Sequence, residues 1–177
     1  FMAGEPFLAF DIIQRRVQYV RDKYSARGNI SFKAVSNGTL VHGEIQKWLL
    51  ENRDLFEIVI SLDGNETTQN NHRGISFEKI DLEFFKNNYK GLHISSVLMP
   101  DNLSTFAEDI KYMESMGFFV KCSIADGVDW DNKEYETMFA NQLNLLIDYY
   151  LHNPHIYPMK MFNVGLHLLY SEEPLRH

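Results

Sequence analysis

The feature that most constrains the fold is a regular alternation of strand-like and helix-like segments along the chain. Short apolar or alternating runs are separated by segments whose apolar residues recur at helical spacing. The strand-like segments are the first residues of the chain and residues 30–35, 56–62, 93–99 and 118–124. Strands that are separated by helices run parallel, with right-handed crossovers. The pattern therefore predicts one α/β domain, either an open doubly wound sheet or part of a barrel.

The segments between the strands complete this organisation. Helices are predicted over residues 7–26, 41–52, 76–88, 103–116 and 132–152. The polar segment 63–74 is predicted to be a loop, and loops of this length tend to be functional or disordered. Residues 153–177 contain several prolines, so they are predicted to be mostly irregular, with a short helix near 163–170. We expect a domain over residues 1–152, followed by a tail or the start of a further region.

Composition excludes several classes of protein. With 177 residues, 45% of them hydrophobic and 14% aromatic, the chain has enough apolar side chains for one core and is not disordered. No apolar run approaches the roughly 18 residues of a membrane-spanning helix. The net charge of −7 argues against nucleic acid as a partner. Cys122 is the only cysteine, so we expect no intramolecular disulfide and a cytoplasmic location.

Ligands of parallel α/β folds bind at the carboxyl ends of the strands. The turns predicted there are Gly4-Glu5-Pro6, Ser36-Asn37-Gly38, Ser61-Leu62-Asp63-Gly64 and Met99-Pro100-Asp101-Asn102. Each of them alone is an ordinary turn or helix cap. Their order and spacing along the chain carry more information than any one of them.

In that order, the segments resemble motifs of radical S-adenosylmethionine (SAM) enzymes, in particular the branch of anaerobic sulfatase-maturating enzymes and peptide maturases. Ala3-Gly4-Glu5-Pro6-Phe7-Leu8 is similar to the Gly-Gly-Glu-Pro-Leu-Leu segment that ends the second barrel strand. Three later segments resemble Thr-Asn-Gly-Thr-Leu, Ser-Leu-Asp-Gly and His-Arg-Gly of that branch: Ser36-Asn37-Gly38-Thr39-Leu40, Ser61-Leu62-Asp63-Gly64 and His72-Arg73-Gly74. The resemblance extends to about residue 125, with Ala3 in place of a glycine and Ser36 in place of a threonine.

The resemblance implies a partial (β/α)6 TIM-like barrel of parallel strands. The first strand and the Cys-x-x-x-Cys-x-x-Cys loop of the family would lie before residue 1, so the chain is expected to be a truncated fragment. An iron–sulfur cluster takes three thiolates from that loop, and Cys122 is interpreted instead as a small core residue.

The implied parent protein is an oxidoreductase with a 4Fe–4S cluster. It would cleave SAM to a 5′-deoxyadenosyl radical and modify a substrate, often a peptide or protein side chain. The chain alone is expected to be inactive and to bind neither SAM nor the cluster.

The resemblance assigns cofactor binding to seven residues: Gly4, Glu5, Pro6, Asn37, Ser61, Asp63 and Arg73. The first three would offer carbonyl groups to the methionyl ammonium, and a glycine permits close approach. Ser61 and Arg73 would lie near the carboxylate or ribose, because an arginine fork grips a carboxylate at two points. Asn37 and Asp63 would face substrate or ribose.

Each of these residues also has a structural interpretation. Glu5 could instead order its loop by accepting backbone hydrogen bonds. Ser61 could be a strand-end serine bonded to its own loop, and Arg73 could be a surface arginine, with His72-Arg73 a solvated pair.

Two other functions stay open at this point. One is a degenerate barrel that acts as a non-catalytic binding or interaction module. The other is an unrelated α/β enzyme that uses carboxylates at strand ends, such as Glu5 and Asp63, which would then lie together with raised pKa values.

The remaining polar groups are interpreted as structural. His152 and His155 have no carboxylate at an obvious ligand spacing, and the acidic loop 126–131 lacks the register of a calcium-binding loop. Asn102 fits the start of a helix. A missing first strand would leave one sheet edge unpaired, so we expect either self-association along that edge or its coverage by residues 153–177.

Overall fold

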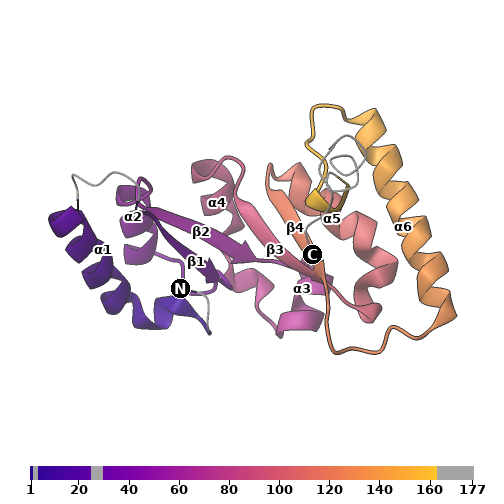
Figure 1. The fold of residues 1–177 in the computed structure, drawn as a ribbon, viewed down its shortest axis with the longest axis horizontal. Coiled ribbons are helices and arrows are strands. Elements are labelled where there is room, and N and C mark those ends of the chain that lie inside the picture. Colours follow the sequence, from indigo (N-terminus) through magenta and orange to yellow (C-terminus); the bar gives the residue numbers. More distant parts are fainter. Residues whose placement is uncertain (2–3, 25–29, 163–177) are drawn as a thin grey trace, which may run out of the picture.

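A computed structural model describes residues 1, 4–24 and 30–162, and its centre is a parallel sheet (Figure 1). The sheet has the order β1 (Phe32–Ser36), β2 (Phe56–Ser61), β3 (His93–Leu98) and β4 (Phe119–Ile124). All three neighbouring pairs are parallel, and the sheet is not closed. The predicted α/β fold with a partial barrel is therefore confirmed.

Helical segments connect the strands, and all except α3 lie at positions expected from the sequence. They are η1 (Pro6–Ala9), α1 (Phe10–Tyr24), α2 (Glu44–Glu51), α3 (Glu66–Arg73), η2 (Phe77–Lys79), α4 (Leu82–Asn88), η3 (Pro100–Thr105), α5 (Phe106–Ser115) and α6 (Lys133–His152). Residues 153–159 are irregular, as predicted, and a helical turn begins at residue 160. The predicted helix near 163–170 and the Ala3 position lie outside the described residues.

The prediction of a loop over residues 63–74 is wrong, because α3 occupies most of this segment. Asn65 caps the helix, since its side chain accepts hydrogen bonds from the backbone N–H groups of Thr67 and Thr68. The buried side chains of α3 are polar and include those of Thr68 and Gln69. Apolar periodicity is the main sequence signal for a helix, and a helix with a polar buried side lacks it.

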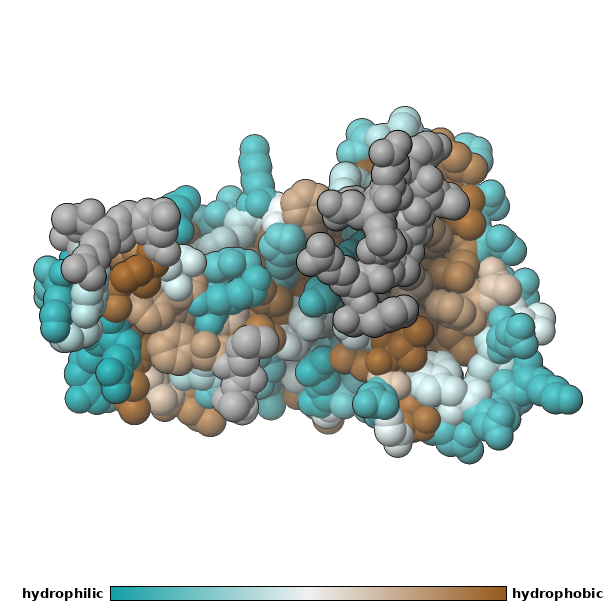
Figure 2. Space-filling model, in the orientation of Figure 1, coloured by the Kyte–Doolittle hydropathy of each residue, from teal (hydrophilic) through white to brown (hydrophobic). Residues whose placement is uncertain are grey.

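Apolar side chains also lie on the surface of α6. Leu145, Ile147 and Leu151 are exposed, although the same helix buries Leu146. Figure 2 shows apolar surface in the region of α6 on the face in view. Even so, no helix in the described part of the chain is both long and apolar enough to cross a membrane.

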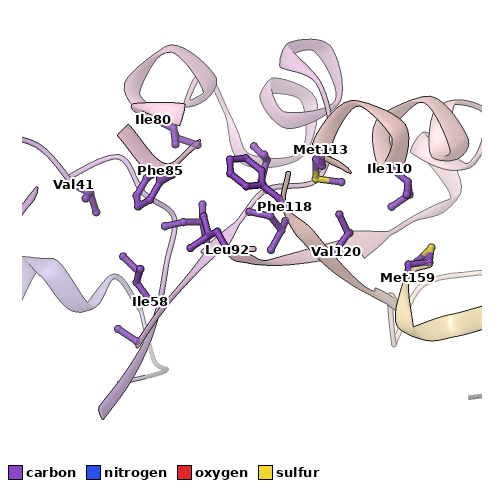
Figure 3. Close-up of a cluster of buried hydrophobic side chains, with 14 of the residues drawn as sticks. Val41, Ile58, Ile80, Phe85, Leu92, Ile110, Met113, Phe118, Val120 and Met159 are labelled. Atoms are coloured by element: carbon purple, nitrogen blue, oxygen red, sulfur yellow. The ribbon is translucent and has the colours of Figure 1, made fainter. Parts of the chain in front are cut away.

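The core lies on one face of the sheet, between the strands and the helices (Figure 3). Every second residue of β2 and β3 points into it, as the period of a strand requires. Ile60 and Ile94 are fully buried there and occupy the same register position on neighbouring strands. Side chains from the helical segments, including Ile80 and Phe85, close this layer.

The opposite face of the sheet carries a mixture of polar and apolar side chains. Register partners of parallel strands point to the same face, so Ser61, Ser95 and Lys121 form a row across β2, β3 and β4. Another row contains the Lys33–Glu57 ion pair, with 2.7 Å between Nζ and Oε1. The sheet therefore presents a buried apolar face and a more polar one.

Both edges of the sheet contact other described residues. At the β1 edge, the backbone carbonyl of Phe1 accepts a hydrogen bond from Val35 N–H, and the nitrogen of Phe1 donates one to the carbonyl of Lys33. This is the pattern of a parallel pair. At the other edge, the Tyr157 ring lies 6.4 Å from the Phe119 ring of β4. The described part of the tail thus contacts the β4 edge, and self-association through the other edge stays a prediction.

Candidate functional site

Glu5 holds the turn that follows β1. Its Oε1 accepts hydrogen bonds from Ser36 Oγ (2.9 Å) and from the backbone N–H of Phe7 (3.2 Å). Its Oε2 accepts a hydrogen bond from the backbone N–H of Asn37 (2.9 Å). The interpretation that Glu5 orders its loop is thereby confirmed. All these donors are neutral, and no cation among the described residues forms an ion pair with Glu5.

The turn itself is an Asx turn, in which a side chain bonds the backbone two residues later. Asn37 Oδ1 accepts hydrogen bonds from the backbone N–H and the hydroxyl of Thr39. Gly38 has a φ of 78°, and a Cβ on it would lie 3.0 Å from Cγ2 of Ile80. The carbonyl end of the Asn37 side chain is thus used within the turn. Its amide N–H groups have no partner in the part of the chain that the structure describes.

Gly4 and Pro6 flank Glu5 on the same strand end. Gly4 has a φ of 64°, which favours glycine, and the space where a Cβ would stand has no atom within 4 Å. Pro6 is buried at the first position of η1, where a missing N–H costs no hydrogen bond. The backbone next to Glu5 is therefore open to approach.

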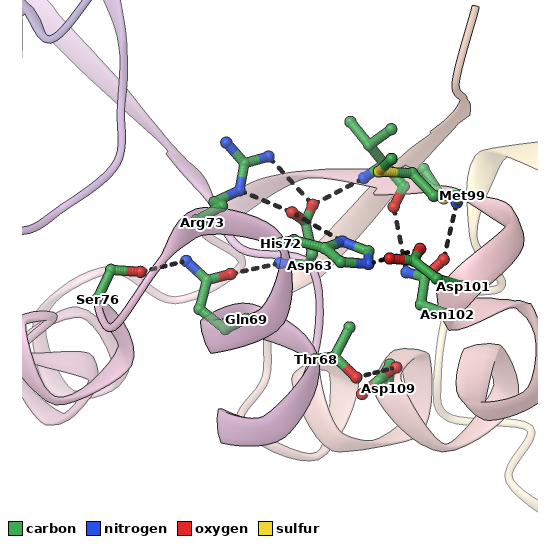
Figure 4. Close-up of polar contacts among 12 residues, drawn as sticks. Asp63, Thr68, Gln69, His72, Arg73, Ser76, Met99, Asp101, Asn102 and Asp109 are labelled. Atoms are coloured by element: carbon green, nitrogen blue, oxygen red, sulfur yellow. Dashed lines mark hydrogen bonds and ion pairs between the residues drawn. The ribbon is translucent and has the colours of Figure 1, made fainter. Parts of the chain in front are cut away.

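Buried Asp63 and partly exposed Arg73 form an ion pair at the end of β2 (Figure 4). Arg73 Nε donates to Oδ2 of Asp63 at 2.7 Å, and Nη2 donates to Oδ1 at 3.1 Å. The Asp63 side chain is 2% exposed and the Arg73 side chain 31%. Oδ1 also accepts a hydrogen bond from the backbone N–H of Val97, on β3. One carboxylate thus joins two neighbouring strand ends.

Arg73 lies at the surface, as its structural interpretation has it, but its guanidinium is held in place by the protein. Its fork does grip a carboxylate at two points, but that carboxylate belongs to Asp63 of the same chain. A guanidinium has more N–H donors than these two bonds use. Arg73 can therefore bind a further acceptor while it stays paired.

His72, next to Arg73, is also buried rather than solvated. Its Nε2 lies 3.1 Å from Oδ1 of Asp101, and its Nδ1 lies 3.5 Å from Oδ2 of Asp63 (Figure 4). The side chain is 4% exposed. The prediction of a solvated His72-Arg73 pair is therefore wrong for His72, whereas Arg73 stays partly exposed to solvent.

Asp109 supports the same corner of the molecule, and no sequence motif pointed to it. Its Oδ1 accepts a hydrogen bond from the backbone N–H of Asn65, and its Oδ2 accepts one from Thr68 Oγ1. A Cβ on Gly64 would overlap the Asp109 carboxylate, so the glycine is needed for close approach. The sequence does hold one signal that could have identified Asp109. It follows Phe106 by three residues, so both lie on the same face of the predicted helix.

Gln69 is a second residue that the sequence did not single out. Its Oε1 accepts a hydrogen bond from the backbone N–H of Asp63 at 2.9 Å, and its Nε2 donates to Ser76 Oγ. The side chain is fully buried. Gln69 therefore fixes the backbone of the residue whose carboxylate Arg73 binds.

Ser61 ends β2, and Asn102 lies in η3, after the neighbouring strand β3. Ser61 lies on the polar face of β2 in register with Ser95, and its hydroxyl makes no hydrogen bond to another described residue. Asn102 is buried, accepts a hydrogen bond from Met99 N–H and donates one to the carbonyl of Val97. The interpretation of Asn102 as a helix-start residue is confirmed, whereas Ser61 keeps a free hydroxyl toward the polar face.

The other candidate groups form only local contacts. His152 Nδ1 lies 2.7 Å from the carbonyl oxygen of Asp148, one turn earlier in α6. Asp126 and Asp129 accept hydrogen bonds from backbone N–H groups within their loop. Within the described ranges, no group of three or more His, Cys, Asp or Glu residues could hold a metal ion. Burial raises the pKa of the Cys122 thiol to about 11, as for a core cysteine.

The carboxylates Glu5 and Asp63 do not form a shared acid–base pair. Each has its own donors, from a different turn. A raised carboxyl pKa occurs elsewhere, at Glu114 between α5 and α6. Burial raises the pKa of Glu114 to about 7, although the hydroxyl of Tyr150 donates to it. The geometry gives no support to an enzyme that works through Glu5 and Asp63.

Comparison with known proteins extends the sequence resemblance to the fold. No protein-family model matches the chain. The uncharacterized protein MJ0907 of Methanocaldococcus jannaschii is 29% identical over 147 residues, which cover 80% of this chain and 50% of that protein.

Solved structures of the anaerobic sulfatase-maturating enzyme anSMEcpe, a radical SAM protein, also match. One with bound AdoMet, which is SAM, has a TM-score of 0.76 at 21% identity, over 98% of this chain and 50% of that one. Those with AdoMet and the Cp18Cys or Kp18Cys peptide have a TM-score of 0.74 at 21% and 22% identity, over 98% of this chain and 52% and 54% of theirs. The chain therefore shares its fold, an open part of the barrel, with these solved structures, and it spans about half the length of the proteins it matches.

Proposed function

We propose that the chain is part of a radical SAM enzyme of the sulfatase-maturating and peptide-maturase type, and that the carboxyl edge of its sheet holds SAM. One observation carries the proposal. Turn segments that resemble this family in their order along the chain lie at one edge of a parallel sheet, in a fold whose matched solved structures bind AdoMet. The likeness of fold alone, at 21% identity, would not carry it.

The charges at this edge suit an amino acid with both an ammonium and a carboxylate. The Glu5 carboxylate accepts only neutral donors, so its negative charge is not cancelled by a neighbouring cation among the described residues. Arg73 cancels the charge of Asp63 and keeps free N–H donors for another acceptor. The site therefore offers acceptors at one end and donors at the other.

The residues then have distinct roles. The carbonyl groups of Gly4, Glu5 and Pro6 bind the methionyl ammonium, and the open space beside Gly4 admits it. The hydroxyl of Ser61 and the remaining N–H groups of Arg73 bind the carboxylate or the ribose. SAM, when bound, would supply a 5′-deoxyadenosyl radical for hydrogen abstraction from the substrate, with release of methionine, on taking one electron from an iron–sulfur cluster held by another part of the protein.

Asn37 and Asp63 receive narrower roles than the resemblance alone implies. We assign the amide N–H groups of Asn37 to an acceptor on the ribose or the substrate, because its side-chain carbonyl oxygen already binds Thr39. Asp63 acts through Arg73, because its own oxygens are occupied by protein donors.

An iron–sulfur cluster does not fit the residues of this chain. The chain has one cysteine, and the described residues contain no metal-ligand cluster. The cluster ligands must then come from another part of the protein, and the chain alone neither holds the cofactors nor turns over. The same proposal assigns residues 1–152 to the barrel and residues 153–177 to a tail or further region.

The substrate that we propose is a peptide or protein side chain, in a reducing compartment such as the cytoplasm. Two of the solved structures with this fold contain peptides, Cp18Cys and Kp18Cys. The row of Ser61, Ser95 and Lys121 gives the open face of the sheet polar groups for such a substrate. Neither nucleic acid nor a membrane is required.

The test is reductive cleavage of SAM by the full-length protein that contains this chain, purified without oxygen and reconstituted with iron and sulfide. We expect methionine and 5′-deoxyadenosine as products. Ser61→Ala should weaken SAM binding several-fold, whereas Arg15→Ala, on the exposed side of α1, should not change it. Absence of both SAM binding and cleavage would contradict the proposal. Binding without cleavage would support the non-catalytic binding module instead.

A further inference from the structure

His72 lies between two carboxylates that belong to different strand ends. It stands near the end of α3, Asp63 follows β2, and Asp101 lies in η3 after β3 (Figure 4). We propose that His72 is a positioning residue of the site. It ties the Asp63–Arg73 pair to η3 and thereby sets the direction in which Arg73 offers its remaining N–H groups. The inference rests on the proposed function, because the ligand of those groups is the carboxylate of SAM.

Burial makes this arrangement specific. The imidazole is 4% exposed, whereas Asp101 is 62% exposed, so His72 connects a buried carboxylate with one at the rim. Nε2 makes the hydrogen bond to Asp101, and Nδ1 is buried without a hydrogen-bond partner, 3.5 Å from Asp63 Oδ2. Buried polar side chains are normally satisfied, so an imidazole held in this position calls for an explanation.

The link to Arg73 passes through the Asp63 carboxylate. Oδ1 is held by the backbone of Val97 and by Nη2 of Arg73. Oδ2 has Nε of Arg73 and, at longer distance, Nδ1 of His72. Removal of the imidazole would leave the last turn of α3 without its tie to η3, and Arg73 would lose orientation while keeping its charge.

The experiment measures the binding of two probes to the full-length protein under anaerobic conditions. One is SAM, and the other is 5′-methylthioadenosine, which has the adenosine and the sulfur but neither carboxylate nor ammonium. His72→Ala should weaken SAM binding about tenfold, the order of one lost hydrogen bond, and should leave 5′-methylthioadenosine binding unchanged. A general structural defect would weaken both probes.

Variants at the two partners separate the contacts. His72→Gln keeps a donor near the position of Nε2, so its SAM affinity should stay within about threefold of the wild type. Asp101→Asn should cause a smaller loss than His72→Ala. The double variant His72→Ala/Asp101→Asn should bind no more weakly than His72→Ala alone, because the two residues act through one contact.

Gln142→Ala is the matched control. Gln142 of α6 is buried, accepts a hydrogen bond from Ala107 N–H and donates one to the carbonyl of Ser104, so its loss should lower stability near η3 without reaching His72. SAM affinity should not change in this variant. Unchanged SAM affinity in His72→Ala, or equal losses for both probes, would overturn the inference. Failure of the wild type to bind SAM would overturn the proposed function, and the inference with it.

Discussion

The turn after β1 and the turn after β2 are both held by a carboxylate, but in different ways. Glu5 accepts hydrogen bonds from a hydroxyl and two backbone N–H groups, and it reaches across from the preceding strand end. Asp63 is buried, is paired with Arg73 at two points, and reaches forward to Val97 of the next strand. The first turn thus keeps a net negative charge, whereas the second is neutral.

The difference teaches how one sheet edge acquires two kinds of binding group. A carboxylate that is held by neutral donors still attracts a cation, which suits the end of the site assigned to an ammonium. A carboxylate that is held by arginine leaves spare N–H donors, which suits the end assigned to a carboxylate. The polarity of the edge therefore depends on the donors of each acid, since both acids carry the same charge.

Arg73→Ala is expected to have the largest effect on this contrast. It leaves the Asp63 carboxylate buried without its cation, and breaking such a pair costs about 3 kcal/mol. Urea unfolding of the chain measures the loss. Arg15→Ala is the control, because it removes an exposed ion pair with Asp11, worth about 0.5 kcal/mol or less. Equal losses in the two variants would mean that Asp63 is not desolvated.

A third carboxylate, Glu114, sharpens the comparison, because it has only one donor. Its folded-state pKa is raised to about 7 by burial from an ordinary value of 4.5, so the folded state holds this proton over a range where the unfolded state has lost it. The stabilisation is complete below about pH 4.5 and is lost as the pH rises to about 7. The contribution of Glu114 should therefore make the free energy of unfolding larger at pH 5 than at pH 8.

Glu114→Gln should remove most of this difference, because the amide is neutral at both pH values. Glu108→Gln, an exposed position on the same helix, is the control and should keep the wild-type dependence. A pH dependence that survives in Glu114→Gln would assign the titration to another group.

Gly64→Ala tests the support beneath Asp63. The added Cβ would overlap the Asp109 carboxylate, and overpacking of this kind costs about 2 kcal/mol. Gly74→Ala is the comparison, because its Cβ would meet open space, and its cost of about 1–3 kcal/mol would come from the backbone alone, since a φ of 64° with a ψ of 178° is a conformation that is essentially restricted to glycine. Thermal unfolding of both variants measures the two costs separately, and a loss well below about 1 kcal/mol for Gly64→Ala would show that the Asp109 carboxylate can move away.

Glu5→Gln is expected to have the smallest effect. The amide keeps one acceptor oxygen, so the variant should lose about 1 kcal/mol of stability in urea unfolding. Glu51→Gln, at an exposed position of α2, serves as the control. If Glu5→Gln cost as much as Arg73→Ala, neutral donors would hold a turn as firmly as an ion pair does, and the comparison would fail.

The strands were predictable from the sequence, because their buried residues follow the simple period of a sheet. Ile58 and Ile60 of β2, and Ile94 of β3, are the apolar residues that identified these segments. α3 was not predictable in the same way, because Thr68 and Gln69 fill its buried side and bond to polar groups from other elements. When the buried side of a helix is polar, the sequence has no apolar periodicity by which the helix could be identified.

For the site, the positions of the turns were predictable and their partners were not. Residues such as Glu5, Asp63 and Arg73 could be chosen because each turn resembles a motif in a fixed order. The contact of Asp109 with Asn65 joins residues 44 positions apart, and that of His72 with Asp101 joins residues 29 apart. Such pairs depend on how the elements pack, so only the structure reveals them.

Glu5 and Asp63 are each anchored in one turn and hold the end of the next strand, Glu5 at Ser36 of β1 and Asp63 at Val97 of β3. If a single one of these loops were transplanted onto another barrel, it would bring either a carboxylate without its hydrogen-bond donors or the donors without their carboxylate. The smallest portable unit is therefore two adjacent turns with the strands that carry them, and new specificities in this scaffold should arise by paired exchanges rather than by isolated ones.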